Sequence, residues 1–170
     1  MQPQRIFIVG TSGAGKSTLA QMLGKRFQLP VIHLDNLAHE PGWILKNETA
    51  IAASFHELAE QPRWVVDGVY FTLATTLRQR ADWLIFLDYG TLFSLRQVIQ
   101  RHLLHRLKLR TRADLAPGFE ERLTWDFLFW VWRWRRDKRQ RWVDELAQYP
   151  AEKVLCFTSR RELMRWFKQL

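Results

Sequence analysis

The stretch Gly10-Thr11-Ser12-Gly13-Ala14-Gly15-Lys16-Ser17 follows directly on the apolar run from Arg5 to Val9. It matches the pattern GxxxxGK[ST], the Walker A phosphate-binding loop, and helical spacing of apolar residues begins right after it. In such a loop the backbone N–H groups and a helix N-terminus surround phosphate oxygens. The sequence therefore predicts that ATP and Mg²⁺ bind at Gly10, Ser12, Gly13, Ala14, Gly15, Lys16, Ser17 and Thr18.

Working outward from this loop, short apolar runs alternate with stretches of helical periodicity. The runs predict five strands, at residues 5–9, 31–34, 64–66, 84–87 and 154–157. Continuous apolar strands separated by helices are typical of a parallel sheet buried on both faces. We therefore expect an α/β, three-layer P-loop NTPase fold with a five-stranded parallel sheet. Residues 35–46, which contain Pro41-Gly42, are predicted to form a loop.

Length and composition predict one domain spanning residues 1–170. The single cysteine, Cys156, cannot form an internal disulfide, and the longest unbroken apolar run, Phe127 to Trp132, is too short to span a membrane. We therefore expect a cytoplasmic protein without a membrane span.

The net charge of +9 is unevenly distributed along the chain. Residues 96–141 contain thirteen Lys and Arg against five Asp and Glu, whereas the residues before and after them are nearly balanced. Such a concentration favours a polyanionic partner, which is either nucleotide phosphates or nucleic acid.

Several classes of P-loop protein lack support in the sequence. No Asn/Thr-Lys-x-Asp motif is present, which argues against a GTPase. Neither Asp67-Gly68 nor Asp88-Tyr89 supplies the Asp-Glu pair common in ATPase motors. A small kinase, which transfers a phosphoryl group to a bound acceptor, is the class that remains.

The chain resembles adenylate-kinase-like enzymes through Trp64-Val65-Val66-Asp67-Gly68 followed by Thr72. More closely, it is similar to the bacterial DNA topology modulation protein family. That resemblance is carried by Gly10 to Thr18, Val31 to Asp35, Pro41-Gly42-Trp43, Asp67-Gly68-x-Tyr70, Ile85 to Asp88 and Arg112-x-Asp114. The adenylate-kinase-like resemblance implies a helical, basic lid at about residues 96–118, whose arginines close over the phosphates; the candidates are Arg101, Arg106 and Arg110.

Two carboxylates follow predicted strands and are candidate site residues. Asp35 could accept the proton of an attacking hydroxyl or orient the ligands of Mg²⁺. Asp67 could hold Mg²⁺ through a water molecule, together with Ser17. The alternative for each is a turn residue. Asp88 is predicted to be structural, and His33 is predicted to be a packed core residue.

A long helix is predicted at about residues 119–146, where five tryptophans are interleaved with arginines. This composition suits packing on the core or on a second subunit, which leaves open a homodimer, and it also suits weak nucleic-acid binding or a membrane surface. The predicted function is transfer of the γ-phosphoryl group of ATP to a nucleotide, nucleoside or other small acceptor. The alternative is an ATP-binding, DNA-interacting regulator that uses residues 96–141.

Overall fold

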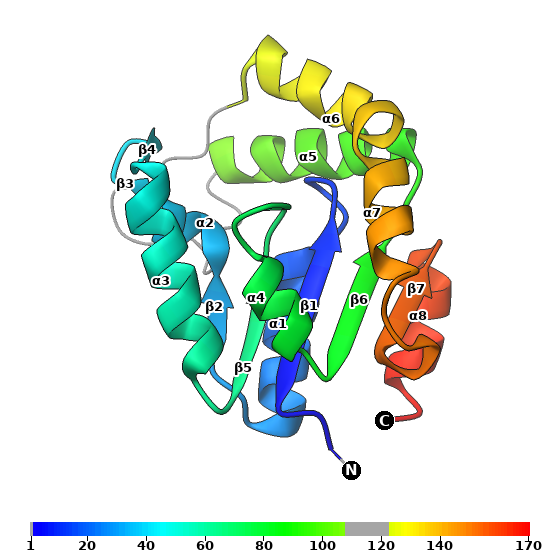
Figure 1. Cartoon of the computed structure of the whole chain (residues 1–170). Helices are drawn as coiled ribbons and strands as arrows, with labels where there is room; N and C mark the ends of the chain where they lie inside the picture. Colours follow the sequence, from blue (N-terminus) through cyan, green and yellow to red (C-terminus); the bar gives the residue numbers. More distant parts are fainter. Residues whose placement is uncertain (1, 108–122) are drawn as a thin grey trace.

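The computed structural model describes residues 2–107 and 123–170. Its central sheet contains five parallel strands in the order β2-β5-β1-β6-β7 (Figure 1). The strands are β1 (Arg5–Gly10), β2 (Val31–His33), β5 (Trp64–Asp67), β6 (Trp83–Leu87) and β7 (Val154–Phe157). The predicted five-stranded parallel sheet is therefore confirmed, with bounds that differ from the expected ones by one residue at some strand ends.

Helices cover both faces of the sheet, as the apolar strands require. In β1, Ile6 and Ile8 point into one hydrophobic cluster while Phe7 and Val9 point into the other. The first cluster is covered by α1 (Lys16–Phe27) and α8 (Arg160–Phe167). The second is covered by α3 (Glu48–Glu60), α4 (Thr75–Arg80), α6 (Trp125–Asp137) and α7 (Arg139–Leu146). The three-layer α/β architecture is confirmed.

Residues 35–46 are more ordered than the predicted loop. Leu34 to Ala38 form the short helix α2, and β3 (His39–Glu40) pairs antiparallel with β4 (Ile44–Leu45). Leu34 and Ala38 are fully buried in the core, so tertiary packing supports a helix too short to be recognised from its sequence. The turn expected at Pro41-Gly42 is present, with Gly42 at φ 84°.

The prediction of a single long helix at residues 119–146 is wrong, because the described part, residues 123–146, contains two helices. Helix α6 begins only after its capping residue Thr124, and the helical path breaks at Lys138, where φ is −121° and ψ is −29°. Helix α7 then runs in a different direction (Figure 1). The helix breaks at Lys138 because the change of direction lets both Trp134 and Trp142 pack in the same buried cluster.

The remaining helices are α5 (Thr91–Arg106), which precedes the undescribed segment, and the 3-10 turn η1 (Ala151–Lys153) before β7. Ser159 caps α8 by accepting a hydrogen bond from the backbone N–H of Glu162, as the sequence predicts. Within the described residues, no helix is both long and apolar enough to cross a membrane.

Candidate active site

The predicted phosphate loop occupies the turn between β1 and α1. Gly13 and Gly15 have φ values of 82° and 90°, which favour glycine. A Cβ atom on Gly13 would also lie 2.9 Å from Cγ2 of Val98 on α5, so this loop packs tightly on that helix. The N-terminus of α1 opens at Lys16, whose Nζ donates a hydrogen bond to the carbonyl oxygen of Thr11 at 3.1 Å. The eight residues predicted to bind ATP therefore lie together, at the last residue of β1, in this turn and in the first residues of α1.

Beside the loop, two side chains contact the carboxylate of Asp67. The Ser17 hydroxyl donates to Oδ2 of Asp67 at 3.0 Å, and Nδ1 of His33 contacts Oδ1. His33 and Asp67 are register partners on the adjacent strands β2 and β5, so both side chains reach the same sheet edge. The prediction that His33 is a packed core residue is wrong, because its ring contacts the carboxylate of Asp67 beside the phosphate loop.

Ser17 and Asp67 form a donor set that fits Mg²⁺. A hydroxyl and a carboxylate are the hard oxygen ligands that this ion prefers, and it takes its other ligands from water and substrate phosphates. Across 2–107 and 123–170, no group of three or more His, Cys, Asp and Glu side chains could hold a metal by itself.

A second polar group lies across from the phosphate loop. The Tyr70 hydroxyl donates a hydrogen bond to Oδ1 of Asp35 at 2.9 Å, and it lies 3.5 Å from Nδ1 of His39. Burial raises the pKa of Tyr70 well above its usual value, and the negative charge of Asp35 raises it further. The phenol therefore stays protonated at neutral pH and fixes the orientation of the Asp35 carboxylate.

A cavity of about 360 Å³ lies between the phosphate loop and the group formed by Asp35, His39 and Tyr70. The phosphate loop contributes Ser12 and Lys16 on one side, and α2 contributes Asp35 on the other. The remaining walls are formed by His39, Trp43, Leu45, Gly68, Val69, Tyr70, Phe127 and Trp130. The arrangement can hold a small hydroxylated molecule between a triphosphate on the loop and a carboxylate able to accept a proton.

The predicted lid arginines are not brought into this cavity. Arg101 and Arg106 lie on α5, and neither lines the cavity. Arg110 lies outside the described residues. Ser94 and Val98 of α5 lie so close to Gly13 that a Cβ atom at that position would clash with both.

The sequence did not predict that the cavity is lined by His39, Trp43, Tyr70, Phe127 and Trp130, although Trp43 and Tyr70 are among the residues that carry the family resemblance. Tyr70 follows a strand end by three residues, a signal that could have pointed to the site. Phe127 and Trp130 carried no local signal, because α6 reaches the cavity only through tertiary packing.

Comparisons with known proteins agree with this fold. No protein-family model matches the chain. A shikimate kinase from Rhodopirellula baltica is 30% identical over 103 residues, which cover 52% of this chain and 55% of the relative. The chain therefore matches only about half the length of this curated relative.

Solved structures of low sequence identity share the architecture. Shikimate kinase from Acinetobacter baumannii, in complex with shikimate, has a TM-score of 0.59 at 15% identity, covering 98% of this chain and 89% of that one. Shikimate kinase from Bacteroides thetaiotaomicron has a TM-score of 0.53 at 17% identity, covering 99% of this chain and 96% of that one. A gluconokinase from Sinorhizobium meliloti has a TM-score of 0.53 at 16% identity, covering 98% of this chain and 89% of that one. The chain has the fold of small P-loop kinases, as the adenylate-kinase-like resemblance implied. The DNA topology modulation family is not shown by these comparisons.

Proposed function

We propose that this chain is an ATP-dependent, Mg²⁺-requiring kinase that phosphorylates a hydroxyl group of a small molecule. The observation that carries the proposal is the cavity bounded by Ser12 and Lys16 on one side and Asp35 on the other. The names of the relatives, shikimate kinase and gluconokinase, support the same reaction type.

In this proposal each end of the cavity has one task. The loop N–H groups and Lys16 hold the β- and γ-phosphates of ATP. The acceptor oxygen attacks the γ-phosphorus, the bond to the β–γ bridging oxygen breaks, and ADP leaves. Asp35 accepts the proton of the attacking hydroxyl, and Tyr70 keeps that carboxylate in position. Bound Mg²⁺, held by Ser17 and Asp67, would neutralise phosphate charge, with His33 orienting Asp67.

Arg101, Arg106 and Arg110 remain candidates for stabilising the migrating phosphoryl group. Arg101 and Arg106 are on α5, which packs directly on the phosphate loop at Gly13. A movement of α5 would therefore also displace the loop.

The DNA-interacting regulator gains no support from the comparisons, which return kinases. Four of the arginines in residues 96–141, the segment assigned to DNA binding, also have carboxylate partners. Arg135 and Arg139 pair with Asp88, and Arg133 and Arg136 pair with Asp137. These four side chains therefore already have anionic partners within the protein.

The test is ADP formation from ATP and Mg²⁺ with a panel of nucleosides, nucleoside monophosphates, sugars and hydroxy acids. We expect ADP to form only when one class of acceptor is added, and Lys16→Ala to remove both ATP binding and turnover. ADP formation that ignores every acceptor would indicate an ATPase. Undiminished ATP binding by Lys16→Ala would overturn the nucleotide assignment.

A further inference from the structure

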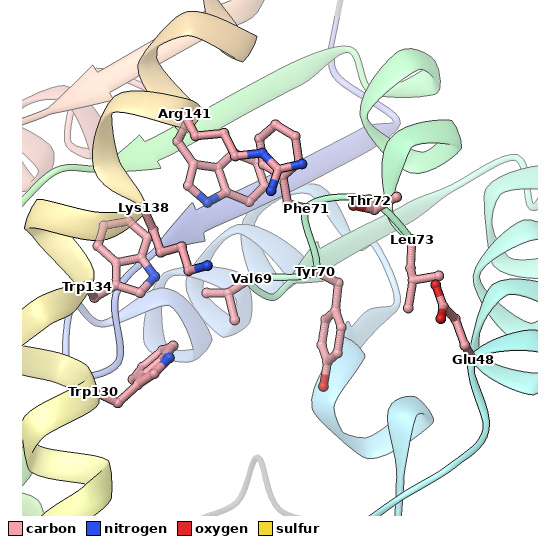
Figure 2. Close-up of a pocket in the computed structure, with 11 residues that line it drawn as sticks. Glu48, Val69, Tyr70, Phe71, Thr72, Leu73, Trp130, Trp134, Lys138 and Arg141 are labelled. Atoms are coloured by element: carbon pink, nitrogen blue, oxygen red, sulfur yellow. The ribbon is translucent and has the colours of Figure 1, made fainter.

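A second cavity, of about 390 Å³, adjoins the first (Figure 2). The proposed reaction places no part of ATP or of the reacting hydroxyl in it. The two cavities share Val69, Tyr70 and Trp130 in their walls. A space of about 360 Å³ beside the phosphate loop already suits a sugar-sized acceptor. The second cavity therefore offers room for a further group on the same acceptor.

Two cations, Lys138 and Arg141, line this second cavity. Figure 2 shows Lys138 extending toward Val69 and Arg141 lying over Phe71, while Glu48 lies on the opposite side. Within residues 2–107 and 123–170, neither cation forms an ion pair or a side-chain hydrogen bond; Arg141 only stacks on Phe71, 3.7 Å from the ring centroid.

The neighbouring basic side chains differ in this respect. Arg133, Arg135, Arg136 and Arg139 are all ion-paired, two with Asp88 and two with Asp137. The basic residues of 133–141 that face the cavity are thus the ones without a carboxylate partner among the described residues. This distribution of charge is expected if a ligand supplies the missing anion.

The side chains of Lys138 and Arg141 are exposed, but contacts of neighbouring residues hold the backbone that carries them. Lys138 lies at the break between α6 and α7, and the arginines on either side of it, Arg135 and Arg139, bind the buried carboxylate of Asp88. The ring under Arg141 is held through Arg78, which is 1% exposed, pairs with Glu145 and donates to the Phe71 carbonyl oxygen at 2.6 Å. The held backbone and the stacking of Arg141 on Phe71 lower the conformational entropy that a ligand must restrict on binding.

We propose that the acceptor carries a phosphate monoester in addition to its reacting hydroxyl, and that Lys138 and Arg141 bind this phosphate. The inference rests on the proposed function, since Asp35 must face the hydroxyl. Two cations match the double negative charge of a phosphate monoester, and Arg and Lys are its usual protein partners. Tyr70 and Trp130, which line both cavities, suit a flat body between hydroxyl and phosphate.

The test compares matched acceptors that differ only by a phosphate, such as nucleosides with their 5′-monophosphates and sugars with their phosphates, and adds hydroxy acids as carboxylate analogues. We expect the phosphorylated member of one pair to be the preferred substrate. Lys138→Gln and Arg141→Gln should each raise KM for it by roughly tenfold to a hundredfold, and change KM for its unphosphorylated partner little. The matched control is Arg136→Gln, whose side chain is 72% exposed and outside both cavities.

Equal turnover within every pair, or a preference for hydroxy acids, would overturn the phosphate assignment. A second measurement does not depend on catalysis: binding of inorganic phosphate to Lys16→Ala, in which the cation of the phosphate loop is removed. We expect binding that Lys138→Gln or Arg141→Gln weakens at least tenfold and Arg136→Gln leaves unchanged. Absent binding, or binding insensitive to both changes, contradicts the inference. Failure of kinase activity with intact phosphate binding would instead contradict the proposed function alone.

Discussion

At the scale of single residues, the chemistry depends on how two carboxylates are surrounded. Asp67 is 5% exposed and contacts Ser17 and His33 beside the phosphate loop. Asp35 lies on the wall of the cavity, where the Tyr70 hydroxyl is its hydrogen-bond donor. In the proposed reaction the first carboxylate serves the nucleotide and the second serves the acceptor, so changes at the two should have separable effects.

Asp35→Asn should slow phosphoryl transfer while ATP binding is retained. The amide keeps the shape of the side chain but cannot accept the hydroxyl proton, so we expect kcat to fall by roughly 10²-fold or more. Steady-state kinetics and an ATP titration measure the two quantities. Glu40→Gln, at the exposed position of β3, is the control and should leave kcat unchanged. If Asp35→Asn transfers phosphate at the normal rate, Asp35 is only a turn residue.

Tyr70→Phe should make the protein less sensitive to alkaline pH. Burial raises the pKa of Tyr70 in the folded state, so above about pH 10 the unfolded chain releases a proton that the folded protein retains. The stability that Tyr70 contributes as a neutral phenol is thus present below pH 10 and is lost as pH rises beyond it.

Urea unfolding at pH 8 and pH 11 measures this effect. We expect wild type to lose more stability between the two values than Tyr70→Phe does. The other tyrosines with raised pKa values, Tyr89 and Tyr149, are present in both proteins and cancel in the comparison. Identical losses would show that Tyr70 ionises as freely in the folded protein as in the unfolded chain.

At the scale of elements, the junction of α6 and α7 is held to the end of β6 by one buried carboxylate. Asp88 accepts hydrogen bonds from Arg135 at 2.8 Å and from Nε of Arg139 at 2.8 and 2.9 Å. The prediction that Asp88 is structural agrees with these contacts. They join the sheet edge to the helices that carry Trp130 and Lys138, and so place the walls of both cavities.

Asp88→Asn should destabilise the protein by about 2 kcal/mol, because two partly buried arginines lose their shared negative charge. Chemical denaturation measures the loss, and KM for the acceptor should rise because the α6–α7 junction is less firmly held. Asp137→Asn is the matched control. Asp137 also pairs with two arginines, Arg133 and Arg136, but its side chain is 34% exposed. We expect little change there, and equal losses for the two variants would contradict the anchoring role of Asp88.

At the scale of the whole molecule, ligand binding should be visible as added stability. The phosphate loop joins β1 to α1 and packs on α5, so a nucleotide bound there stabilises the folded chain and not the unfolded one.

Mg²⁺ with a non-hydrolysable ATP analogue at about 100 times its Kd should add about 2.7 kcal/mol and raise Tm by about 5–10 °C. Calorimetry with and without Mg²⁺ measures the shift, which should be smaller without the ion. The Lys16→Ala variant should show little shift, while its Tm without ligand stays near the wild-type value. A full shift in that variant would contradict the predicted binding site.

The sequence by itself determined the class of fold and the place of the nucleotide. Both depend on local patterns. The loop from Gly10 to Ser17 needs glycines and a lysine at fixed spacing, and continuous apolar runs such as Ile6–Val9 require a sheet covered on both faces. Asp35 and Asp67 could be singled out because each follows a strand, and the carboxyl ends of parallel strands share one edge.

Only the tertiary structure decided what surrounds those residues. The position of His33 beside Asp67 depends on which strands are neighbours, and the order β2-β5-β1-β6-β7 is not written in any local pattern. The helix predicted at 119–146 breaks at Lys138 because the long-range contacts of Trp134, Trp142 and Asp88 outweigh helical propensity. The same packing brings Trp130, Lys138 and Arg141 beside the loop that follows β5. A cavity formed by segments far apart in the chain depends on the folding of the whole molecule, because no single segment can bury its own walls.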